Sequence, residues 1–257
     1  MAEFKDLNKF EKLKSVVLNS NKIYTQWQDV FSKGAEPALE KWGVGVLWGL
    51  YQNFAINAFF NKHDLVETKQ YFYTCGRLDE VAINKHDEKI LDYGINHLSY
   101  ALLSDNIALI RRYADLKHSG YDEMINNGSS TPLYILQCLI KDDWDNFERV
   151  MPIMKNKSAP KLKMELDLAF FEALADRNKT KAEEVISELL SPKVHAQRNK
   201  NHELINQFIS HPALGYAKLA WIKGVEVKIS NPLVPEELLP VNPNERYTDT
   251  YPFLRNL

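Results

Sequence analysis

Cysteine is nearly absent from the sequence. Only Cys75 and Cys138 occur in 257 residues, and neither belongs to a CxxC pair or to a Cys/His pattern with the spacing of a metal site. This excludes a disulfide framework and a cysteine-based zinc site as the basis of the fold. We expect two reduced, half-buried thiols, as is usual in cytosolic proteins.

An excess of either charge is also lacking. The chain has 32 Lys and Arg against 34 Asp and Glu, so its formal net charge is -2 at pH 7. This balance creates no strong field that would attract nucleic acid or an anionic membrane, and neither is expected as a partner. Hydrophobic residues at 45% and charged residues at 26% are ordinary values for a globular protein that buries a sizeable core.

Catalytic motifs are missing as well. The sequence contains no GxGxxG, P-loop, GxSxG or HExxH pattern, and no two of its seven histidines are four residues apart. His195 and His202 could lie two turns apart on one helix with Glu203 beside them, which leaves a metal site as an alternative to two solvated histidines. We predict no catalytic residue, no cofactor and no metal, and expect that the protein is not an enzyme.

The amino-terminal segment "MAEFKDLNKFEKLKSVVL" has charges every few positions and lacks the apolar core of a signal peptide. It is therefore interpreted as the first helix of a cytoplasmic protein. Apolar residues at three- and four-residue steps predict this helix from Phe4 to Val17, and a second helix is predicted over residues 21–32. Gly34 and Pro37 mark the break that follows.

The longest hydrophobic run covers residues 42–61, which carry no charge and equal the length needed to span a bilayer. Its amide side chains would be unfavourable in lipid unless paired, and its flanks show no clear Lys/Arg asymmetry. We therefore expect no membrane span but a central helix buried on all sides. Three glycines would let neighbouring helices approach it closely: Gly43, Gly45 and Gly49.

Helix starts are well marked in the second half of the chain. Ser or Thr followed closely by Pro is typical of a capped first turn, and a Thr with Glu three positions later is typical of a capping box. These signals predict starts at Thr131-Pro132, Thr180 with Glu183, Ser191-Pro192, and Ser210 before Pro212.

A weak internal repeat has an offset of 37 residues, since "LSYALLSDNIALIRRY" from Leu98 aligns with "ILQCLIKDDWDNFERV" from Ile135. The polar break Asp105-Asn106 falls on Asp142-Asp143, and a third copy near residues 168–190 fits with an insertion at Asn178. Each unit has the form helix, tight acidic turn, helix. The predicted fold class is all-α, with stacked antiparallel hairpins in a solenoid-like bundle.

The character of the chain changes after Trp221. "GVEVKIS" alternates apolar and polar residues, which is typical of a short strand or an extended segment. Four prolines at 232, 235, 240 and 243 and several aromatics follow. Because proline cannot extend a helix and apolar side chains need a surface, we predict an extended strap packed on the helices over residues 225–257. The whole chain, residues 1–257, is predicted to be a single helical domain.

The residues that best suit a partner lie in the acidic turn "KDDWDNFE", where carboxylates surround an aromatic ring. Such a group can bind the basic surface of another protein. The candidate partner-binding residues are Asp142, Asp143, Trp144, Asp145 and Glu148. The favoured alternative for Trp144 is a core position, because it aligns with Ile107. The aspartates are expected to face solvent in either case.

The segment "HPALGYAKLAWIKGVEVKISNPLVPEELLP", followed by "YPFL", resembles the carboxyl-terminal region of the bacterial immunity protein 49 family. These helical proteins are encoded beside polymorphic or contact-dependent toxins. The resemblance implies a cytoplasmic protein that binds and neutralises a cognate toxin by occlusion. It transfers no catalytic residue, and no toxin-contacting residue can be assigned by position.

Two other functions stay open at this point. A helical-repeat scaffold or adaptor could bind a peptide or protein in the concave face of stacked hairpins. A helical enzyme with an unfamiliar site would need a bound metal or a deep polar cleft near His195 and His202.

Overall fold

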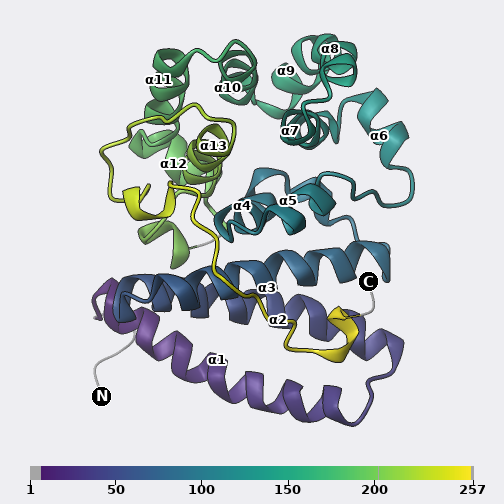
Figure 1. The fold of residues 1–257 in the computed structure, drawn as a ribbon, viewed down its shortest axis with the longest axis vertical. Coiled ribbons are helices and arrows are strands. Elements are labelled where there is room, and N and C mark those ends of the chain that lie inside the picture. The colour runs from purple at the N-terminus through teal and green to yellow at the C-terminus, as the bar shows by residue number, and fades with distance from the viewer. Residues whose placement is uncertain (1–6, 202, 256–257) are drawn as a thin grey trace.

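The computed structural model describes residues 7–201 and 203–255, which form helices and connecting segments without a strand (Figure 1). The all-α prediction is confirmed. The first helices are α1 (Lys9–Ser32), α2 (Pro37–Asn57), α3 (Leu65–Asn84), α4 (Ile95–Leu103), α5 (Ile107–Tyr113), α6 (Tyr121–Asn127) and α7 (Thr131–Lys141). They are followed by α8 (Trp144–Ile153), α9 (Ala159–Leu162), α10 (Glu165–Ala175), α11 (Lys179–Leu189), α12 (Pro192–Arg198) and α13 (His211–Ile222).

Shorter helical turns join or follow these helices. Two are π-helical: η2 (Ala58–Lys62) and η4 (Met154–Ser158). Four are 3₁₀ turns: η3 (Ile90–Tyr93), η5 (Ile205–Gln207), η6 (Glu236–Leu238) and η7 (Pro252–Leu254).

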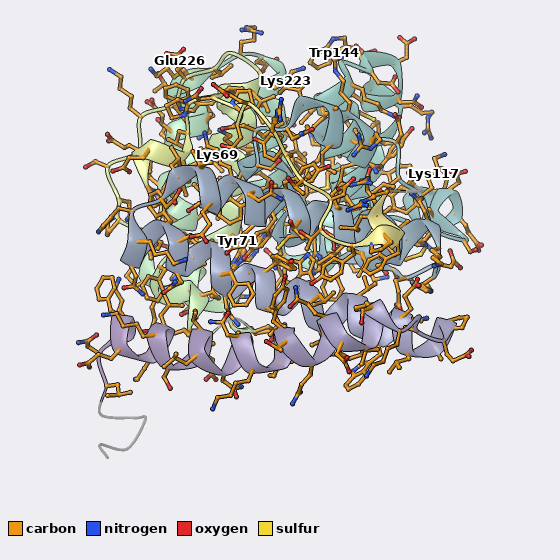
Figure 2. All side chains as sticks on the ribbon, turned by 60° about the horizontal axis from the view of Figure 1, so that its bottom comes forward. Lys69, Tyr71, Lys117, Trp144, Lys223 and Glu226 are labelled. Atoms are coloured by element: carbon orange, nitrogen blue, oxygen red, sulfur yellow. The ribbon has the colours of Figure 1, made fainter. Side chains whose placement is uncertain are left out.

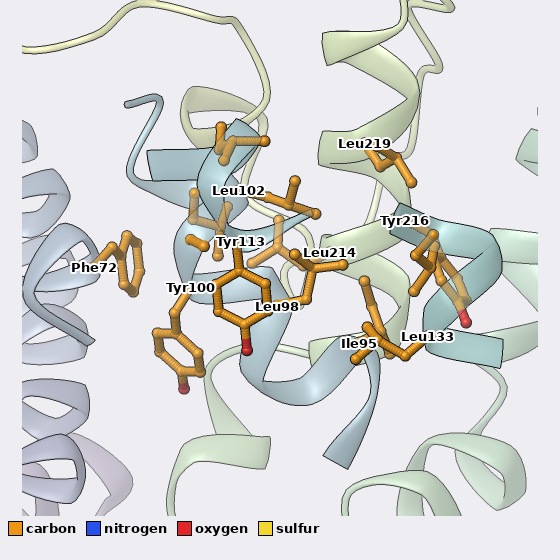
Figure 3. Packing of buried hydrophobic residues seen from close by; sticks show 14 of the residues in the cluster. Phe72, Ile95, Leu98, Tyr100, Leu102, Tyr113, Leu133, Leu214, Tyr216 and Leu219 are labelled. Atoms are coloured by element: carbon orange, nitrogen blue, oxygen red, sulfur yellow. The ribbon is translucent and has the colours of Figure 1, made fainter. Parts of the chain in front are cut away.

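The helices form two parts that meet along α3 and α4. The long helices α1, α2 and α3 lie side by side at the bottom of Figure 1, and the shorter helices are stacked above them. Figure 3 shows the core between the parts, where Phe72 of α3 lies beside Tyr100 of α4. Their ring centroids are 5.4 Å apart, and on the other side of α4 the buried side chains Leu98 and Leu214 join α4 to α13.

The first helix differs from its prediction. Residues 9–32 form one continuous helix, so the two separate helices predicted there are wrong. Asn8 caps this helix: its side chain accepts hydrogen bonds from the N–H groups of Phe10 and Glu11, and Glu11 accepts one from Asn8. Polar residues between the two predicted helices lower helix propensity only slightly, and no Gly or Pro interrupts them. The predicted start at Phe4 lies outside the described residues.

The helix α2, which contains most of the uncharged run 42–61, is buried along its second half, whereas Trp42 near its start is 65% exposed, so burial on all sides is only partly correct. Two of its amides find partners inside the protein. Gln52 Nε2 donates to the Tyr100 hydroxyl at 2.5 Å, and Asn53 Nδ2 donates to Ser20 Oγ at 3.3 Å. Among residues 7–201 and 203–255, none of the helices combines the length and apolarity that a bilayer crossing requires.

Only one glycine of α2 serves the close packing that was predicted. A Cβ atom at Gly43 would lie 2.4 Å from the Trp27 ring, so α1 can approach only a glycine at this position. A Cβ atom at Gly45 or Gly49 would have no neighbour within 4 Å. For these two residues the predicted role is wrong, because the described part of the chain leaves open space beside both of them.

A two-residue turn recurs between successive helices. Its first residue has a left-handed backbone, and the side chain of its second residue caps the next helix by accepting from the third N–H group. Asn and Asp favour such positions because they tolerate positive φ and cap well. The turn occurs at His63-Asp64, Asp105-Asn106, Asp142-Asp143 and Arg177-Asn178.

The turn defines the hairpins α4–α5, α7–α8 and α10–α11, which are the three predicted repeat units. In the third unit the cap is Asn178, whose side chain accepts from the N–H of Lys181 at 3.0 Å. The capping box predicted at Thr180 is therefore wrong, because α11 has already begun there. The other three predicted starts coincide with the beginnings of α7, α12 and α13.

The strap (described residues 225–255) is extended at its beginning but forms no strand. Val225, Val227 and Ile229 are buried while Glu226 and Lys228 are exposed, so the predicted alternation is present without a neighbouring strand in the described chain. The strap, yellow in Figure 1, then crosses α3 and ends beside α2 and α1. There the hydroxyl oxygens of Tyr251 and Tyr51 are 3.3 Å apart, and the ring centroids of Phe253 and Phe31 are 4.9 Å apart.

A buried ion cluster holds the strap against both parts of the molecule. Asp105 pairs with Lys69 of α3 at 2.8 Å and with Lys218 of α13, and all three side chains are at most 2% exposed. Lys218 Nζ donates to the strap carbonyls of Leu239 and Pro240 at 3.1 and 3.0 Å. Burial lowers the pKa of Lys218, and the Asp105 carboxylate opposes this shift.

A second group of charges fixes the end of the strap. Arg77 of α3 donates to Asp249 at 3.1 Å and to the Leu254 carbonyl. Arg77 also pairs with the buried Glu80, which in turn accepts from Arg112 of α5 at 2.7 Å. The strap therefore takes part in hydrogen bonding that also joins α3 to α5.

We predict that Asp105→Asn lowers the free energy of unfolding by about 3–5 kcal/mol, because two buried ammonium groups lose their carboxylate. Asp142→Asn is the matched control, since Asp142 has the same left-handed backbone but is 59% exposed and faces Lys223. Loss of this exposed pair should cost at most about 1 kcal/mol. Urea denaturation of both variants measures the difference, and equal losses would contradict the role of the buried cluster.

The single-domain prediction covers residues 1–257, of which 1–6, 202 and 256–257 lie outside the described residues, and it leads to a second test. Truncation after Gly224 removes eight apolar side chains that are buried within residues 225–255. Burial of each contributes about 1.5–3 kcal/mol, so their sum exceeds the usual stability of a whole domain. They are Val225, Val227, Ile229, Val234, Leu238, Leu239, Tyr251 and Leu254.

We expect the truncated chain to lose its cooperative thermal transition, measured by circular dichroism. As a control, the exposed strap residues Glu226, Lys228 and Ser230 are replaced together by alanine, which should leave the melting temperature nearly unchanged. A truncated chain that melts like the full-length protein would show that the strap adds nothing to stability.

Candidate partner-binding surface on α8

The five candidate residues lie in the turn between α7 and α8 and in the first turns of α8. Figure 2 shows Trp144 at the periphery of the molecule. Asp142 has a left-handed backbone, Asp143 caps α8, and the helix begins at Trp144. The structure thus gathers these residues at one corner, but their surroundings differ.

Two of the carboxylates have structural partners. Asp142 Oδ1 accepts from Lys223 Nζ at 2.6 Å. Asp143 accepts from the backbone N–H of Asn146 at 3.3 Å and from its side-chain amide at 2.8 Å. Lys223 follows directly after α13 and is 81 residues away in the sequence. The sequence pattern of the turn therefore could not reveal this pairing. Asp142 is therefore already paired with a cation, and Asp143 already serves as a helix cap.

The other two carboxylates have no hydrogen-bond or ion-pair partner within the described part of the chain. Asp145 and Glu148 are exposed, and no hydrogen bond or ion pair joins either carboxylate to residues 7–201 or 203–255. They are three positions apart on α8 and so lie on one face. This face can accept a basic group of a partner without breaking an internal pair.

Trp144 is 43% exposed, so its interpretation as a core residue is wrong. The residue aligned with it, Ile107, is 38% exposed. Both are the first residue of the second helix in a hairpin, a position that points away from the stack. The repeat alignment was correct, and the assumption that Ile107 is buried was the error. The Trp144 ring packs edge-on against Phe147 at 5.7 Å.

An apolar groove continues from Phe147 and was missed by sequence reasoning. It measures about 410 Å³ and lies between α8 and α10. Phe147, Met151 and Pro152 form its apolar part, and its polar lining consists of Glu148, Lys155, Asn156 and Glu172. The spacing of Phe147 and Met151 on one helix face was a signal for it. Pro152 could have been read as a kink, and the structure places it where α8 passes into η4. Trp144, the free carboxylates and this groove together form the α8 surface.

The structure offers little support for chemistry elsewhere. Both ring nitrogens of His195 have polar neighbours, with Asn206 O at 3.0 Å and Asn199 Nδ2 at 3.2 Å, and His202 lies outside the described residues. Within residues 7–201 and 203–255 no three His, Cys, Asp or Glu side chains are grouped to hold a metal ion.

Neither cysteine is an activated nucleophile. Both are free and buried, and burial raises the pKa of Cys138 to about 11 and the pKa of Cys75 well above its usual value. Since the thiolate is the reactive form, both side chains are protonated and inert near neutral pH.

Comparison with known families decides the relationship of the chain. Residues 63–238 match the family model described as immunity protein 49, which covers more than half of the sequence. The chain belongs to the immunity protein 49 family. No curated protein and no solved structure is significantly similar to it.

The immunity protein 49 match confirms the resemblance stated from the sequence. It contains the α8 surface, the three hairpins and the first part of the strap. The helices α1 and α2 and the "YPFL" ending lie outside the matched range. The family thus covers the hairpin stack, on which the candidate residues lie.

The two kinds of carboxylate at the α8 surface should differ in stability tests. Asp143→Ala removes a helix cap and is expected to lower the free energy of unfolding by about 1 kcal/mol. Asp145→Ala removes an exposed side chain without an internal partner and should stay within about 0.5 kcal/mol of the parent protein. Chemical denaturation separates the two. A larger effect at Asp145 would mean that it, too, has a structural role.

Proposed function

We propose that this member of the immunity protein 49 family binds a cognate bacterial toxin and neutralises it by covering the toxin's functional surface. The observation that carries the proposal is the family match over residues 63–238. The proposed place of action is the cytoplasm, as part of a polymorphic toxin system. Binding is the proposed activity, without catalysis or a cofactor and without nucleic acid or membrane as a partner.

The α8 surface is the proposed contact with the toxin. Asp145 and Glu148 have no partner among residues 7–201 and 203–255, so an approaching Lys or Arg would not have to displace one of these. Trp144 is exposed beside them and can bury a large apolar area, and such aromatic residues dominate binding energies at interfaces. The groove lined by Met151 and Pro152 provides space for an apolar side chain of the toxin. We therefore propose a toxin with a basic surface.

A scaffold or adaptor remains the second candidate, because the groove between α8 and α10 would also accept a peptide. The two functions differ in their partner. An immunity protein binds a folded toxin domain and removes its toxicity, whereas an adaptor binds a segment that is harmless by itself.

The proposal predicts a toxin gene beside the gene of this protein, and co-expression with that toxin tests the function. We expect growth to be restored and a stable equimolar complex to be recovered by size-exclusion chromatography with light scattering. Continued toxicity at equal expression, with no complex, would contradict the proposal.

Within that complex, Trp144→Ala should weaken toxin binding by about 2 kcal/mol, close to thirtyfold in Kd, as expected for an aromatic anchor. Ile107→Ala is the matched control, because Ile107 has the same place in its hairpin and similar exposure. The double variant Asp145→Asn with Glu148→Gln should also bind the toxin more weakly than the parent protein, and its binding should depend less on salt. Calorimetric titration measures the toxin affinity of all three variants. If the Trp144→Ala and Ile107→Ala proteins bind the toxin equally well, α8 is not part of the interface.

A further inference from the structure

A larger pocket lies apart from the α8 surface, between the strap and the junction of η2 with α3. Its volume is about 680 Å³, within the range of ligand-binding clefts. In Figure 1 this part of the strap is on the left, whereas α8 is at the upper right. The apolar walls include Phe59, Phe60, Leu65, Ile229, Pro232 and Pro235.

The walls of the pocket are fixed by contacts behind them. Phe60 packs on the buried Phe208 at 5.0 Å between ring centroids. On the strap side, the Leu233 carbonyl accepts from the N–H of Ser210 at 2.9 Å, and the Val234 N–H donates to Asn231 O at 2.9 Å. Proline further restricts this segment. A partner would therefore meet a surface that is already in place, which lowers the entropy lost on binding.

The rim of the pocket carries two carboxylates that lack internal partners. Glu236 and Glu237 lie in η6 and are exposed. Among the described residues, none forms an ion pair or a side-chain hydrogen bond with either of them. The buried Leu238 and Leu239 hold the turn in place just behind them. The pocket thus combines an apolar interior with a negative edge.

We infer that this pocket is a second contact for the toxin and takes one apolar side chain that has a Lys or Arg next to it. The inference rests on the proposed function and adds a site to it. The apolar side chain would enter the space between Phe59 and Pro232, and the neighbouring cation would pair with Glu236 or Glu237. An acidic or purely polar segment lacks both of these interactions.

The test measures toxin affinity of two variants of the full-length protein that change charge equally. Glu236→Lys with Glu237→Lys reverses the rim of the pocket. Glu226→Lys with Glu245→Lys reverses two exposed carboxylates of the same strap that do not line the pocket. The first variant should bind about tenfold more weakly or worse, whereas the second should bind much like the parent protein. Melting temperatures establish that both variants are folded.

A cross-linking experiment identifies the toxin segment directly. A photoreactive phenylalanine analogue is placed at Ser230, which lines the pocket, and in a control protein at Glu226, which does not. Mass spectrometry should locate the Ser230 cross-link at an apolar residue beside Lys or Arg.

The results separate the pocket from the proposed function. Equal affinity of the two charge variants, or a cross-link from Ser230 to an acidic segment, would overturn the pocket as a contact. The proposed function would still stand if the parent protein protected against the toxin. Failure of the parent protein to protect against the toxin would overturn both.

Discussion

The placement of Asp105 between two buried lysines is the constraint on which the rest of the structure depends. Two ammonium groups meet one carboxylate, so the cluster retains a positive charge that must be solvated inside the protein. The strap supplies this solvation through the carbonyl groups of Leu239, Pro240 and Asn242. The helices thus need the strap to satisfy Lys69 and Lys218, and the strap is held by the same bonds.

The same local turn has different uses in different hairpins. Asp105 and Asp142 share a left-handed backbone and precede a capping residue, yet the first is fully buried and the second faces solvent beside Lys223. Position in the stack decides between them, because Asp105 lies where α3, α13 and the strap converge. In the hairpin α7–α8 the turn meets only Lys223 at the end of α13, and Asp142 stays 59% exposed. There it leaves Trp144 exposed and gives rise to the α8 surface.

Both proposed contacts have the same physical character. At α8 and at the strap pocket, carboxylates without internal partners stand beside an apolar space. Pairs inside the protein already satisfy most other buried charges, such as Asp167 with Arg198 at 2.7 Å. A rigid helical stack with exposed carboxylates beside two apolar recesses is suited to binding another macromolecule. This agrees with membership of the immunity protein 49 family.

The sequence by itself determined the all-α class, three of the four predicted helix starts, the hairpin repeat, the alternation that opens the strap, and the family. Each follows from neighbouring residues, since periodicity, caps and prolines act over a few positions. Tertiary structure alone decided which of these residues are buried. The pairing of Asp142 with Lys223, the exposure of Trp144 and the burial of Lys69 and Lys218 all depend on segments far apart in the chain. Local patterns cannot specify them, because burial is set by whichever distant element packs against a residue.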